Sequence, residues 1–375
     1  MNTPTPELSV IIPVLHDTGE LCGLLSSLAG QTGTTFEVIV CDGDSGDRSH
    51  SLAHAWQDTG PFPLKTVSSP PGRGIQMNAG AAIAAGSILL FLHADSRFDR
   101  PDALAAAVQT YRHTRRLSPL PLAARFRLDF RRGSNDAQLR YLFLETKARL
   151  DRVECIRGDQ GIMIEPALFH QLGCFDPSLP YLEDVRFAAL VAGAGSWLLL
   201  PAAVSTSTRR FEQEGYGTRQ LLNAVIINAI HTGWTGLLET LPELYRDSRH
   251  GGKIQLYPLL AGIRAALSGC DRSWRRNFWR ETGRHAVANA WQLCLLADVR
   301  SGRRAGLDAD TIPLRRLKHY APRLEELQGS RGAALLASLL LRLLFAAAVS
   351  GAWAVWRFCP ERLTGTRQKG RSPAP

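Results

Sequence analysis

The chain of 375 residues is longer than a usual single domain, and with 45% hydrophobic residues it can bury a large core. Its seven cysteines are scattered, with no CxxC pair or Cys/His cluster, which argues against a disulfide framework or a zinc site and favours the reduced cytoplasm. The net charge of +10 is uneven, because residues 1–246 sum to −3 and residues 247–375 to +13. The basic region therefore indicates an anionic partner, either nucleic acid or a lipid surface.

We expect no secretory signal, because the first residues lack a basic stretch and the first apolar run is only as long as a strand. Strands then alternate with helices. The expected strands are 8–14, 36–41, 64–67 and 87–92, and the expected helices are 20–29, one that ends near 57, and 75–85. This alternation predicts a mostly parallel, three-layer α/β sheet.

The pattern continues more irregularly along the chain. It predicts helices at 102–116, 137–150, 166–172 and 182–192, and strands at 123–130, 162–164 and 197–200. After Gly217 the strand signals nearly vanish and helices dominate.

Acidic residues follow the second and fourth expected strands, where open α/β sheets bind ligands. Asp42 opens a polar loop that includes Ser45, and Asp95 stands just after the fourth strand with His93 two residues before it. A carboxylate there suits Mg²⁺ or Mn²⁺ held against a diphosphate, and His93 could add an imidazole. The alternatives are turn chemistry for the first loop and a helix N-cap for the second.

The helix expected at 75–85 begins with glycines and an arginine. Gly72, Arg73 and Gly74 precede it, and Asn78 lies in its first turns. Free N–H groups at a helix start and a guanidinium suit a phosphate. The spacing is not GxGxxG, so a Rossmann cofactor site has weak support, and a loop with a solvated arginine is the alternative.

Three later segments are also polar. Glu183 and Asp184 begin a helix, where one carboxylate could act as a general base and the other could stabilise the helix start. Residues 158–161 form a polar loop before a strand, and Arg209 and Arg210 suit a diphosphate leaving group. Helix-terminal charge, an ordinary turn and paired surface arginines are the alternatives.

The order of these segments is more specific than any one of them. Together they resemble the family-2 glycosyltransferases, which have a GT-A nucleotide-sugar-binding fold, and among them the bacterial radical-SAM/selenodomain-associated subgroup. The resemblance covers about residues 7–246. It rests on Ser-Val-Ile-Ile-Pro at 9–13, Gly-Arg-Gly-Ile-Gln-Met-Asn-Ala-Gly at 72–80, Phe-Leu-His-Ala-Asp at 91–95, Gly-Asp-Gln-Gly at 158–161 and Leu-Glu-Asp-Val at 182–185.

The resemblance implies transfer of a single sugar from a nucleotide-diphosphate donor, with inversion and with a divalent metal. Asp184 would be the general base, with Glu183 as the second choice, and Asp95 with His93 would hold Mg²⁺ or Mn²⁺. The donor would be contacted by the other residues of the site, which are Pro13, Asp42, Ser45, Gly72, Arg73, Asn78, Arg209 and Arg210.

The chain departs from the family pattern in two places. His93 takes the first position of the usual Asp-x-Asp metal motif, which puts the affinity for metal and the choice of metal in question. The Gln-x-x-Arg-Trp motif of processive members is absent, with Phe211 where tryptophan would stand, and this argues against polymer synthesis.

Residues 247–375 lie outside the resemblance. Trp274, Trp279 and Trp291 stand among arginines on expected helices, as in segments that bind anionic membranes, and an ordinary helical bundle is the alternative. The segment 333–358 is nearly all apolar, but Arg342 would cost about 2.5–3.5 kcal/mol at the centre of a span. A membrane span and a buried or re-entrant helix therefore stay open.

We predict a GT-A glycosyltransferase domain at 1–246 and a basic, mostly helical region at 247–375, in a cytoplasmic protein that associates with the membrane. The acceptor would present a hydroxyl or carboxylate, and an apolar, carotenoid-type acid would fit the membrane contact. One rival is a sugar-phosphate nucleotidyltransferase, but residues 16–19 do not supply its glycine-rich loop. The other is a non-catalytic nucleotide-sugar-binding scaffold, which loss of Asp95 or Asp184 would have favoured. No nucleic-acid partner is expected, because no binding motif is visible.

Overall fold

The computed structural model describes residues 5–44, 46, 56, 60–132 and 138–358. The chain divides into two compact units. The first comprises Met1–Thr208 and Val299–Ile312, and the second comprises Arg209–Asp298 and Pro313–Pro375. Ser45 and most of the helix expected to end near residue 57 lie outside the described residues.

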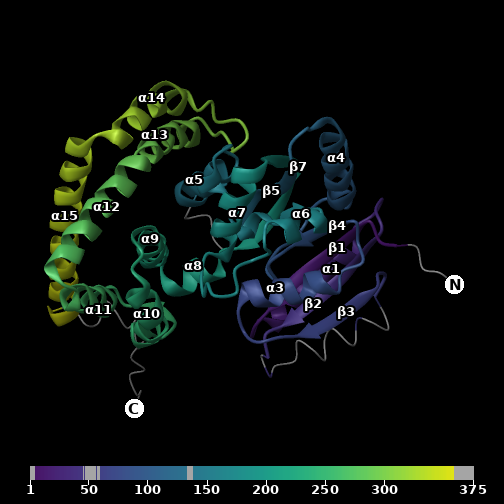
Figure 1. The fold of residues 1–375 in the computed structure, drawn as a ribbon, viewed down its shortest axis with the longest axis horizontal. Coiled ribbons are helices and arrows are strands. Elements are labelled where there is room, and N and C mark those ends of the chain that lie inside the picture. The colour runs from purple at the N-terminus through teal and green to yellow at the C-terminus, as the bar shows by residue number, and fades with distance from the viewer. Residues whose placement is uncertain (1–4, 45, 47–55, 57–59, 133–137, 359–375) are drawn as a thin grey trace, which may run out of the picture. The chain divides into compact units, whose positions relative to one another are not determined.

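The first unit is built on a seven-stranded sheet with the order β3-β2-β1-β4-β6-β5-β7 (Figure 1). Its strands are β1 (Leu8–Val14), β2 (Phe36–Asp42), β3 (Leu64–Ser68), β4 (Ile88–Phe91), β5 (Leu122–Arg131), β6 (Ile162–Ile164) and β7 (Ser196–Ser207). Only β6 runs antiparallel to its two neighbours, and the other pairs are parallel. The predicted, mostly parallel α/β sheet is therefore confirmed.

Helices cover the sheet. Those of the first unit are α1 (Thr18–Ala29), α3 (Arg73–Ala82), α4 (Ala103–Leu117), α5 (Gln138–Ala148), α6 (Pro166–Gln171) and α7 (Glu183–Ala194), with short 3-10 helices η2 (Val153–Cys155) and η3 (Gly158–Gln160). Every residue of β1 and β2 is buried, which requires cover on both faces of the sheet. This cover explains why both strands are mostly apolar, and the buried Ser9 of β1 donates to the Glu37 carboxylate of β2 at 2.7 Å.

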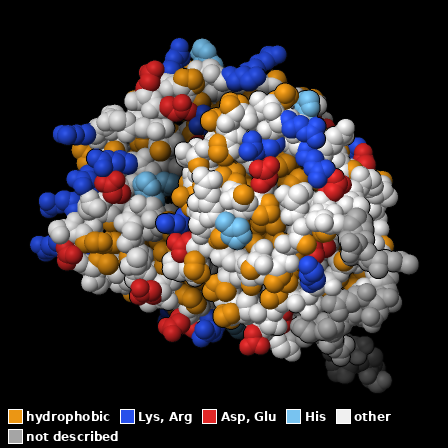
Figure 2. All heavy atoms as spheres, turned by 45° about the vertical axis from the view of Figure 1, so that its right-hand side comes forward, with side chains coloured by type: hydrophobic (Ala, Val, Ile, Leu, Met, Phe, Trp, Pro, Cys, Tyr) orange, Lys and Arg blue, Asp and Glu red, His pale blue; other side chains and the backbone are white. Residues whose placement is uncertain are grey.

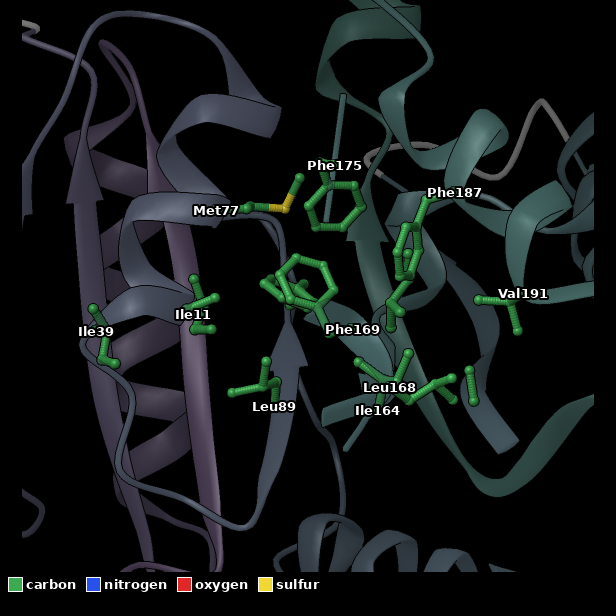
Figure 3. Close-up of a cluster of buried hydrophobic side chains, with 14 of the residues drawn as sticks. Ile11, Ile39, Met77, Leu89, Ile164, Leu168, Phe169, Phe175, Phe187 and Val191 are labelled. Carbon is green, nitrogen blue, oxygen red and sulfur yellow. The ribbon is translucent and has the colours of Figure 1, made fainter. Parts of the chain in front are cut away.

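An aromatic cluster joins the sheet to α6 and α7, as Figure 3 shows. Phe91 at the end of β4 has its ring centroid 4.9 Å from that of Phe169 and 5.0 Å from that of Phe175. The ring centroid of Phe175 lies 4.9 Å from that of Phe187, which is on α7. Buried aromatic pairs at this spacing hold α7 in a defined position beside the end of β4.

The segment Val299–Ile312 belongs to the first unit although it is distant in sequence. The Asp310 carboxylate lies 2.7 Å from Nε of Arg149 and 3.1 Å from Nη1 of Arg127 on β5. Val299 and Ile312 are buried. The first unit therefore needs residues beyond position 246 to be complete.

The second unit is helical apart from a short pair of strands, β8 (Arg249–His250) and β9 (Lys253–Ile254). Its helices are α8 (Arg209–Glu214), α9 (Tyr216–Thr232), α10 (Thr235–Asp247), α11 (Leu256–Gly269), α12 (Arg272–Ala288), α13 (Trp291–Arg304, whose last residues belong to the first unit), α14 (Arg315–Glu326) and α15 (Arg331–Phe358), with η4 at Leu327–Gly329. The mainly helical C-terminal region is confirmed.

The boundary between the compact units lies at Thr208, whereas the sequence analysis placed the domain boundary at residue 246. Helices α8–α10 group with the C-terminal helices because α9 packs against α12. Nδ2 of Asn228 donates to Oγ1 of Thr282, and the rings of His231 and His285 lie 4.5 Å apart.

The two units differ in charge. The first has 21 Lys and Arg against 23 Asp and Glu, a net of −2, and the second has 23 against 11, a net of +12. Over the face shown in Figure 2, acidic and basic side chains are interspersed. By these counts, the net positive charge of the whole chain comes from the second, helical unit.

Candidate active site

The carboxyl ends of β1, β2 and β4 meet at one edge of the sheet, and Gln76 ties two of them together. Its side-chain amide donates to the carbonyl oxygens of Val14 (2.8 Å) and Cys41 (2.7 Å). Gln76 is 1% exposed, so these bonds are shielded from water. They hold Asp42, the buried last residue of β2, at this edge.

Helix α3 begins at the same edge with Arg73. Gly72 at its N-cap has φ 144°, a conformation that favours glycine. Nε of Arg73 lies 2.9 Å from Oε1 of Glu183, and its Nη1 lies 3.5 Å from Nε2 of His93. Arg73 is thus paired with a carboxylate of α7 and also contacts the loop after β4.

The approach of α3 to α7 depends on Gly74. A Cβ at this position would lie 3.3 Å from Cβ of Phe175 and 3.5 Å from Cβ of Glu183. Burial alone would lower the pKa of Arg73, but Glu183, Asp184 and Asp159 outweigh burial and raise it. The guanidinium is therefore a fixed positive charge in the site.

Asp95 is held by the end of β7. Its Oδ2 accepts hydrogen bonds from Oγ1 of Thr206 (2.9 Å) and from the backbone N–H of Ser207 (3.4 Å). Thr206 is buried, and Asp95 is half-buried. These bonds orient the Asp95 carboxylate beside His93, two residues earlier in the chain.

The start of α7 is strained. Leu182 adopts φ 60°, the left-handed region, where a leucine costs about 1–3 kcal/mol. Glu183 (2% exposed) and Asp184 (6% exposed) follow directly and are buried. A strained residue just before two buried carboxylates is typical of a functional position, because the surrounding packing must hold it there.

The two oxygens of Asp184 have different surroundings. Oδ2 accepts a hydrogen bond of 2.6 Å from the backbone N–H of Gly158. Among the described residues, Oδ1 has no hydrogen-bond partner although it is buried. A buried acceptor without a partner is uncommon, and it marks a place where a ligand can donate.

The loop 158–161 brings this N–H and a further carboxylate to the site. A Cβ at Gly158 would lie 3.0 Å from Nε2 of His93 and 3.3 Å from Cβ of Asp184, so a larger residue would require these side chains to shift. Gln160 anchors the loop, because its Nε2 donates to the carbonyl of Ala148 (2.8 Å) and its Oε1 accepts from the N–H of Arg157 (2.9 Å).

Asp159 is the further carboxylate. Burial, then the negative charges of Asp184 and Asp95, raise its pKa to about 7, and Arg157 and Arg73 only partly offset them. Its Oδ1 is buried and, within the described part of the chain, has no hydrogen-bond partner. Burial also raises the pKa of Glu183 despite the neighbouring Arg73.

This arrangement fits a divalent cation. The charges of Asp184 and Asp95 both act against ionisation of Asp159, and among the described residues Oδ1 of Asp159 and Oδ1 of Asp184 have no hydrogen-bond partner. The described residues contain no group of three or more His, Cys, Asp or Glu side chains placed to enclose a metal. Mg²⁺ and Mn²⁺ need only one or two carboxylates when a phosphate supplies other ligands.

The sequence comparison relates part of the chain to a family. Residues 9–168 match the model of Glycosyl transferase family 2. These residues are less than half of the chain. The first unit, in which they lie, is built on the mostly parallel seven-stranded α/β sheet described above.

Similar proteins carry related names. A PGL/p-HBAD biosynthesis glycosyltransferase of Mycobacterium bovis is 35% identical over 101 residues, which are 27% of this chain and 40% of that protein. The match thus spans less than half of the first curated relatives. An uncharacterized glycosyltransferase of Mycobacterium tuberculosis is 27% identical over 285 residues, 74% of this chain and 98% of the relative.

Two solved structures are similar at low identity. The mannosyltransferase PcManGT of Pyrobaculum calidifontis, in complex with GDP-Man and Mn²⁺, has 18% identity and a TM-score of 0.45, and the match covers 90% of this chain and 88% of that one. Residues 1–349 of S. aureus TarS, in complex with UDP, have 19% identity and a TM-score of 0.44, with 80% and 92% covered.

Several residues predicted for the glycosyltransferase site come together in the first unit. Arg73, His93, Glu183 and Asp184 are joined by direct contacts or by the loop 158–161. Asp95 lies near enough to Asp159 for its charge to raise the pKa of that carboxyl.

Other predicted residues are placed differently. Asn78 donates to the carbonyl of Phe175 (2.8 Å) and accepts from its N–H (3.1 Å), which is a clamp between α3 and the segment before α7. Pro13 is buried within β1. Arg209 and Arg210 are exposed residues at the start of α8 in the second unit, where Nε of Arg210 lies 3.9 Å from Glu214.

The sequence analysis missed three residues of the candidate site, namely Gln76, Asp159 and Thr206. Gln76 and Asp159 lie inside the motifs that carried the resemblance, and their polar side chains within buried surroundings were the available signal. Thr206, which holds Asp95, gave no signal, because it lies in a strand far along the chain.

Proposed function

We propose that the protein is a family-2 glycosyltransferase that moves one sugar from a nucleotide-diphosphate donor to a hydroxyl or carboxylate acceptor, with inversion. The observation that supports the proposal is the buried Asp184 carboxylate. Its Oδ2 accepts from the N–H of Gly158, and its Oδ1 has no hydrogen-bond partner within the part of the chain that the structure describes. Ligands bind at the carboxyl edge of the sheet in open α/β folds.

In a single displacement, Asp184 acts as the general base. The N–H of Gly158 fixes Oδ2 and leaves Oδ1 to accept the proton of the acceptor hydroxyl. The acceptor oxygen then bonds to the anomeric carbon while the bond from that carbon to the diphosphate oxygen breaks. The proton stays on Asp184, and the nucleoside diphosphate leaves as an anion.

Glu183 is less suited to this role. Arg73 already pairs with it, and the pair joins α3 to α7. Burial raises the pKa of Glu183 despite this pairing, but the contact with Arg73 leaves the carboxylate less free to accept a proton from an acceptor. We infer that Glu183 instead positions Arg73 beside His93.

The residues fit a divalent metal at Asp95, with His93 beside it. When bound, Mg²⁺ or Mn²⁺ supplies a positive charge that neutralises the leaving diphosphate. Asp95 is the hard oxygen ligand, and Thr206 keeps its carboxylate oriented. His93 is the poorer ligand for Mg²⁺, because imidazole suits softer metals.

The donor contacts are assigned by position. Asp42 at the end of β2 accepts hydrogen bonds from the base or ribose, and Gly72 with Arg73 faces the diphosphate at the start of α3. Pro13 and Asn78 complete the donor pocket, Asn78 through its clamp on Phe175. The sequence also predicts Ser45, outside the described residues, and Arg209 and Arg210, in the second unit, as donor contacts.

We also propose that the enzyme works at the cytoplasmic membrane surface through its basic helical unit. One helix, Arg331–Arg357, is long and apolar enough to cross a membrane by length and composition. Membrane contact would give the enzyme access to an apolar acceptor. The reaction itself does not depend on that contact.

A thermal-shift screen tests the donor. UDP-, GDP- and dTDP-sugars are added to the full-length protein with and without Mn²⁺. A ligand at about 100 times its Kd stabilises by about 2.7 kcal/mol, so one nucleotide class should raise the Tm by several degrees, and only with Mn²⁺. No shift with any nucleotide sugar, with or without metal, would contradict the proposal.

A further inference from the structure

Helix α15 has two unlike sides. Its 28 residues contain no Asp or Glu. Ala334, Ser338 and Val349 are buried. Six leucines are 50–64% exposed, and they are Leu335, Leu336, Leu339, Leu340, Leu343 and Leu344. A continuous apolar face of this size is unusual on a soluble surface and marks a contact with another body.

The buried side packs along most of the helix. A Cβ on Gly283 of α12 would lie 2.2 Å from the carbonyl oxygen of Ala334, so the two backbones touch there. Further along, the ring of Trp279 lies 6.0 Å from that of Phe345. Near the end, the ring of Tyr257 on α11 lies 5.1 Å from that of Trp356.

The leucine face points away from this packing. Successive side chains are about 100° apart around a helix, so Leu336 and Leu340 lie about 200° from Ala334 and Ser338 respectively. Leu343 lies on the same side as Leu336, because the two are seven residues apart. Helix α12 and the leucine face therefore occupy opposite sides of α15.

This packing argues against a membrane span. Helix α12 carries Arg272, Arg276, Arg280 and Arg284, all exposed and four residues apart, on one of its sides. If α15 crossed a bilayer with its packing intact, α12 would enter the hydrocarbon with these charges, which is costly for each of them. If α15 crossed alone, it would give up its packing on α12 and α11.

The positive charge of the helical unit indicates which kind of surface the leucine face contacts. Its described residues contain 19 Lys and Arg against 10 Asp and Glu. Helix α15 itself carries three arginines, at positions 331, 342 and 357. The guanidinium of Arg342 lies 5.9 Å from the ring centre of Trp279. Basic residues at the margin of an apolar face match the phosphates of an anionic lipid surface.

We propose that α15 lies in the plane of an anionic bilayer, with its leucine face inserted and α12 on the aqueous side. The inference rests on the proposed membrane contact and is independent of the donor chemistry. It places the C-terminus on the same side of the membrane as the catalytic unit. A span would place them on opposite sides.

Vesicle flotation tests the inserted face. Full-length protein is mixed with vesicles of phosphatidylcholine and phosphatidylglycerol at a ratio of 3:1. The triple variant Leu336→Gln, Leu340→Gln, Leu343→Gln should lower the partition coefficient at least about 100-fold, because three inserted leucines are lost. The matched control Leu117→Gln, Leu120→Gln, Leu293→Gln changes leucines that are exposed elsewhere and should bind like the parent.

Protease access tests the orientation. An epitope tag is added at the C-terminus, and protein bound to preformed vesicles is treated with external protease. An in-plane helix leaves the tag fully cleavable, whereas a span protects it inside the vesicle. Pure phosphatidylcholine vesicles should bind at least about 10-fold more weakly than the anionic mixture, because they lack the attraction to basic residues.

Three results would overturn the inference. The first is a C-terminal tag that is protected from external protease. The second is equal flotation of the triple variant and the parent. The third is a triple variant that loses self-association in light scattering while it binds vesicles normally. The last result would show that a second copy of the chain covers the leucines. Each variant is first checked for nucleotide-sugar thermal shifts, so that failure of membrane insertion is distinguished from failure of the glycosyltransferase assignment.

Discussion

Glu183 and Asp184 are adjacent, but their carboxylates meet different partners. Glu183 pairs with Arg73 at 2.9 Å, and Asp184 accepts from the N–H of Gly158 at 2.6 Å. Both are buried, so these polar contacts are shielded from water. These contacts support the proposed positioning role of Glu183 and the proposed proton-accepting role of Asp184.

Asp184→Asn separates catalysis from binding. The amide keeps the size of the side chain and still accepts from Gly158, but it cannot take a proton. We expect transfer to fall by about 10²–10⁴, the usual contribution of a general base, while donor affinity changes little. The rate is measured as release of nucleoside diphosphate, and affinity by titration calorimetry.

Glu183→Gln is the matched control. It removes the partner of Arg73, so we expect weaker donor binding and a lower Tm, with a smaller loss of kcat than in Asp184→Asn. A collapse of kcat in Glu183→Gln with near-normal turnover in Asp184→Asn would reverse the two roles.

Asp95→Ala tests the metal site. It removes the proposed ligand, and Thr206 loses its acceptor at the end of β7. We expect the Mn²⁺-dependent part of the donor thermal shift to disappear, while circular dichroism shows an intact fold. His93→Ala should weaken that part less, because imidazole is a poor match for Mg²⁺. An unchanged metal-dependent shift in Asp95→Ala would remove this residue from the site.

At the scale of elements, close approach depends on glycine. Gly74 allows α3 to reach Glu183, and Gly158 allows its loop to lie against His93. Gly283 does the same for α12 and α15. The nearest neighbour is a backbone oxygen at Gly283 and a side chain at Gly74 and Gly158, so an added methyl group has little room.

Gly283→Ala should destabilise the helical unit. Alanine is the better helix former, but its Cβ would lie 2.2 Å from the carbonyl of Ala334. Overpacking typically costs about 1–3 kcal/mol, which exceeds the gain in helix propensity. We expect a lower urea midpoint of unfolding.

Gly351→Ala, on α15 itself, provides the control. Nothing lies within 4 Å of a Cβ at that position, so the change should be neutral or should stabilise by up to about 1 kcal/mol. Equal effects of the two substitutions on the urea midpoint would show that α12 and α15 are not in close contact.

The contact between α9 and α12 carries a pH dependence. Burial, then the neighbouring His231, lower the pKa of His285 from 6.5 to about 4. The unfolded chain therefore takes up a proton below pH 6.5 that the folded protein takes up only near pH 4. Stability that is present above pH 6.5 is lost as the pH falls through this window.

We expect the Tm of the helical unit to drop between pH 6.5 and about 4, and His285→Gln to flatten this drop. Calorimetry across the range measures the effect. His250→Gln, at an exposed position, should leave the pH profile as in the parent. A profile that is equally steep in His285→Gln would assign the pH dependence to other groups.

At the scale of the whole molecule, the first unit is not continuous in sequence. Asp310 pairs with Arg127 and Arg149, and the pairing lowers the pKa of the Asp310 carboxyl despite its partial burial. Val299 and Ile312 are buried in the same segment. The first unit is thus supported by a segment that is distant in sequence.

Truncation after Arg246 tests this support. The shortened chain loses the partner of Arg149 and two buried apolar side chains, each worth about 1.5–3 kcal/mol. We expect its Tm to lie at least about 5 °C below the corresponding transition of the full chain. Asp310→Asn alone should lower the free energy of unfolding by less than about 1 kcal/mol for each of its ion pairs with Arg127 and Arg149, because Asp310 is 46% exposed. An unchanged Tm after truncation would make the segment dispensable.

Much of the fold could be predicted from local pattern. Apolar runs of strand length between helical segments indicated the mostly parallel sheet, because strands covered on both faces, such as β1 and β2, need no polar side. The helical character after Gly217 followed from the loss of such runs. The division between units could not be predicted, because the packing of α9 on α12 and of Asp310 on Arg149 leaves no local trace.

The candidate site was predictable in its motifs and less so in its roles. Asp95, Arg73 and the Glu183–Asp184 pair stood out because polar residues follow buried strands or begin helices. Asn78 was expected in the donor pocket, but its amide clamps the backbone of Phe175. A side chain on one helix does not show in its own segment which backbone will pack beside it.

The sequence by itself determined which chemical groups this protein brings to the edge of its sheet, because strand ends and helix starts are set by local patterns of apolar residues, glycine and acids. Only the tertiary structure decided what each group does. Arg73 meets Glu183 across 110 residues of sequence, and Gly158 reaches Asp184 across 26. Such pairings arise from the packing of α3, α7 and the loop 158–161 against one another, and packing depends on shape in three dimensions rather than on the order of residues.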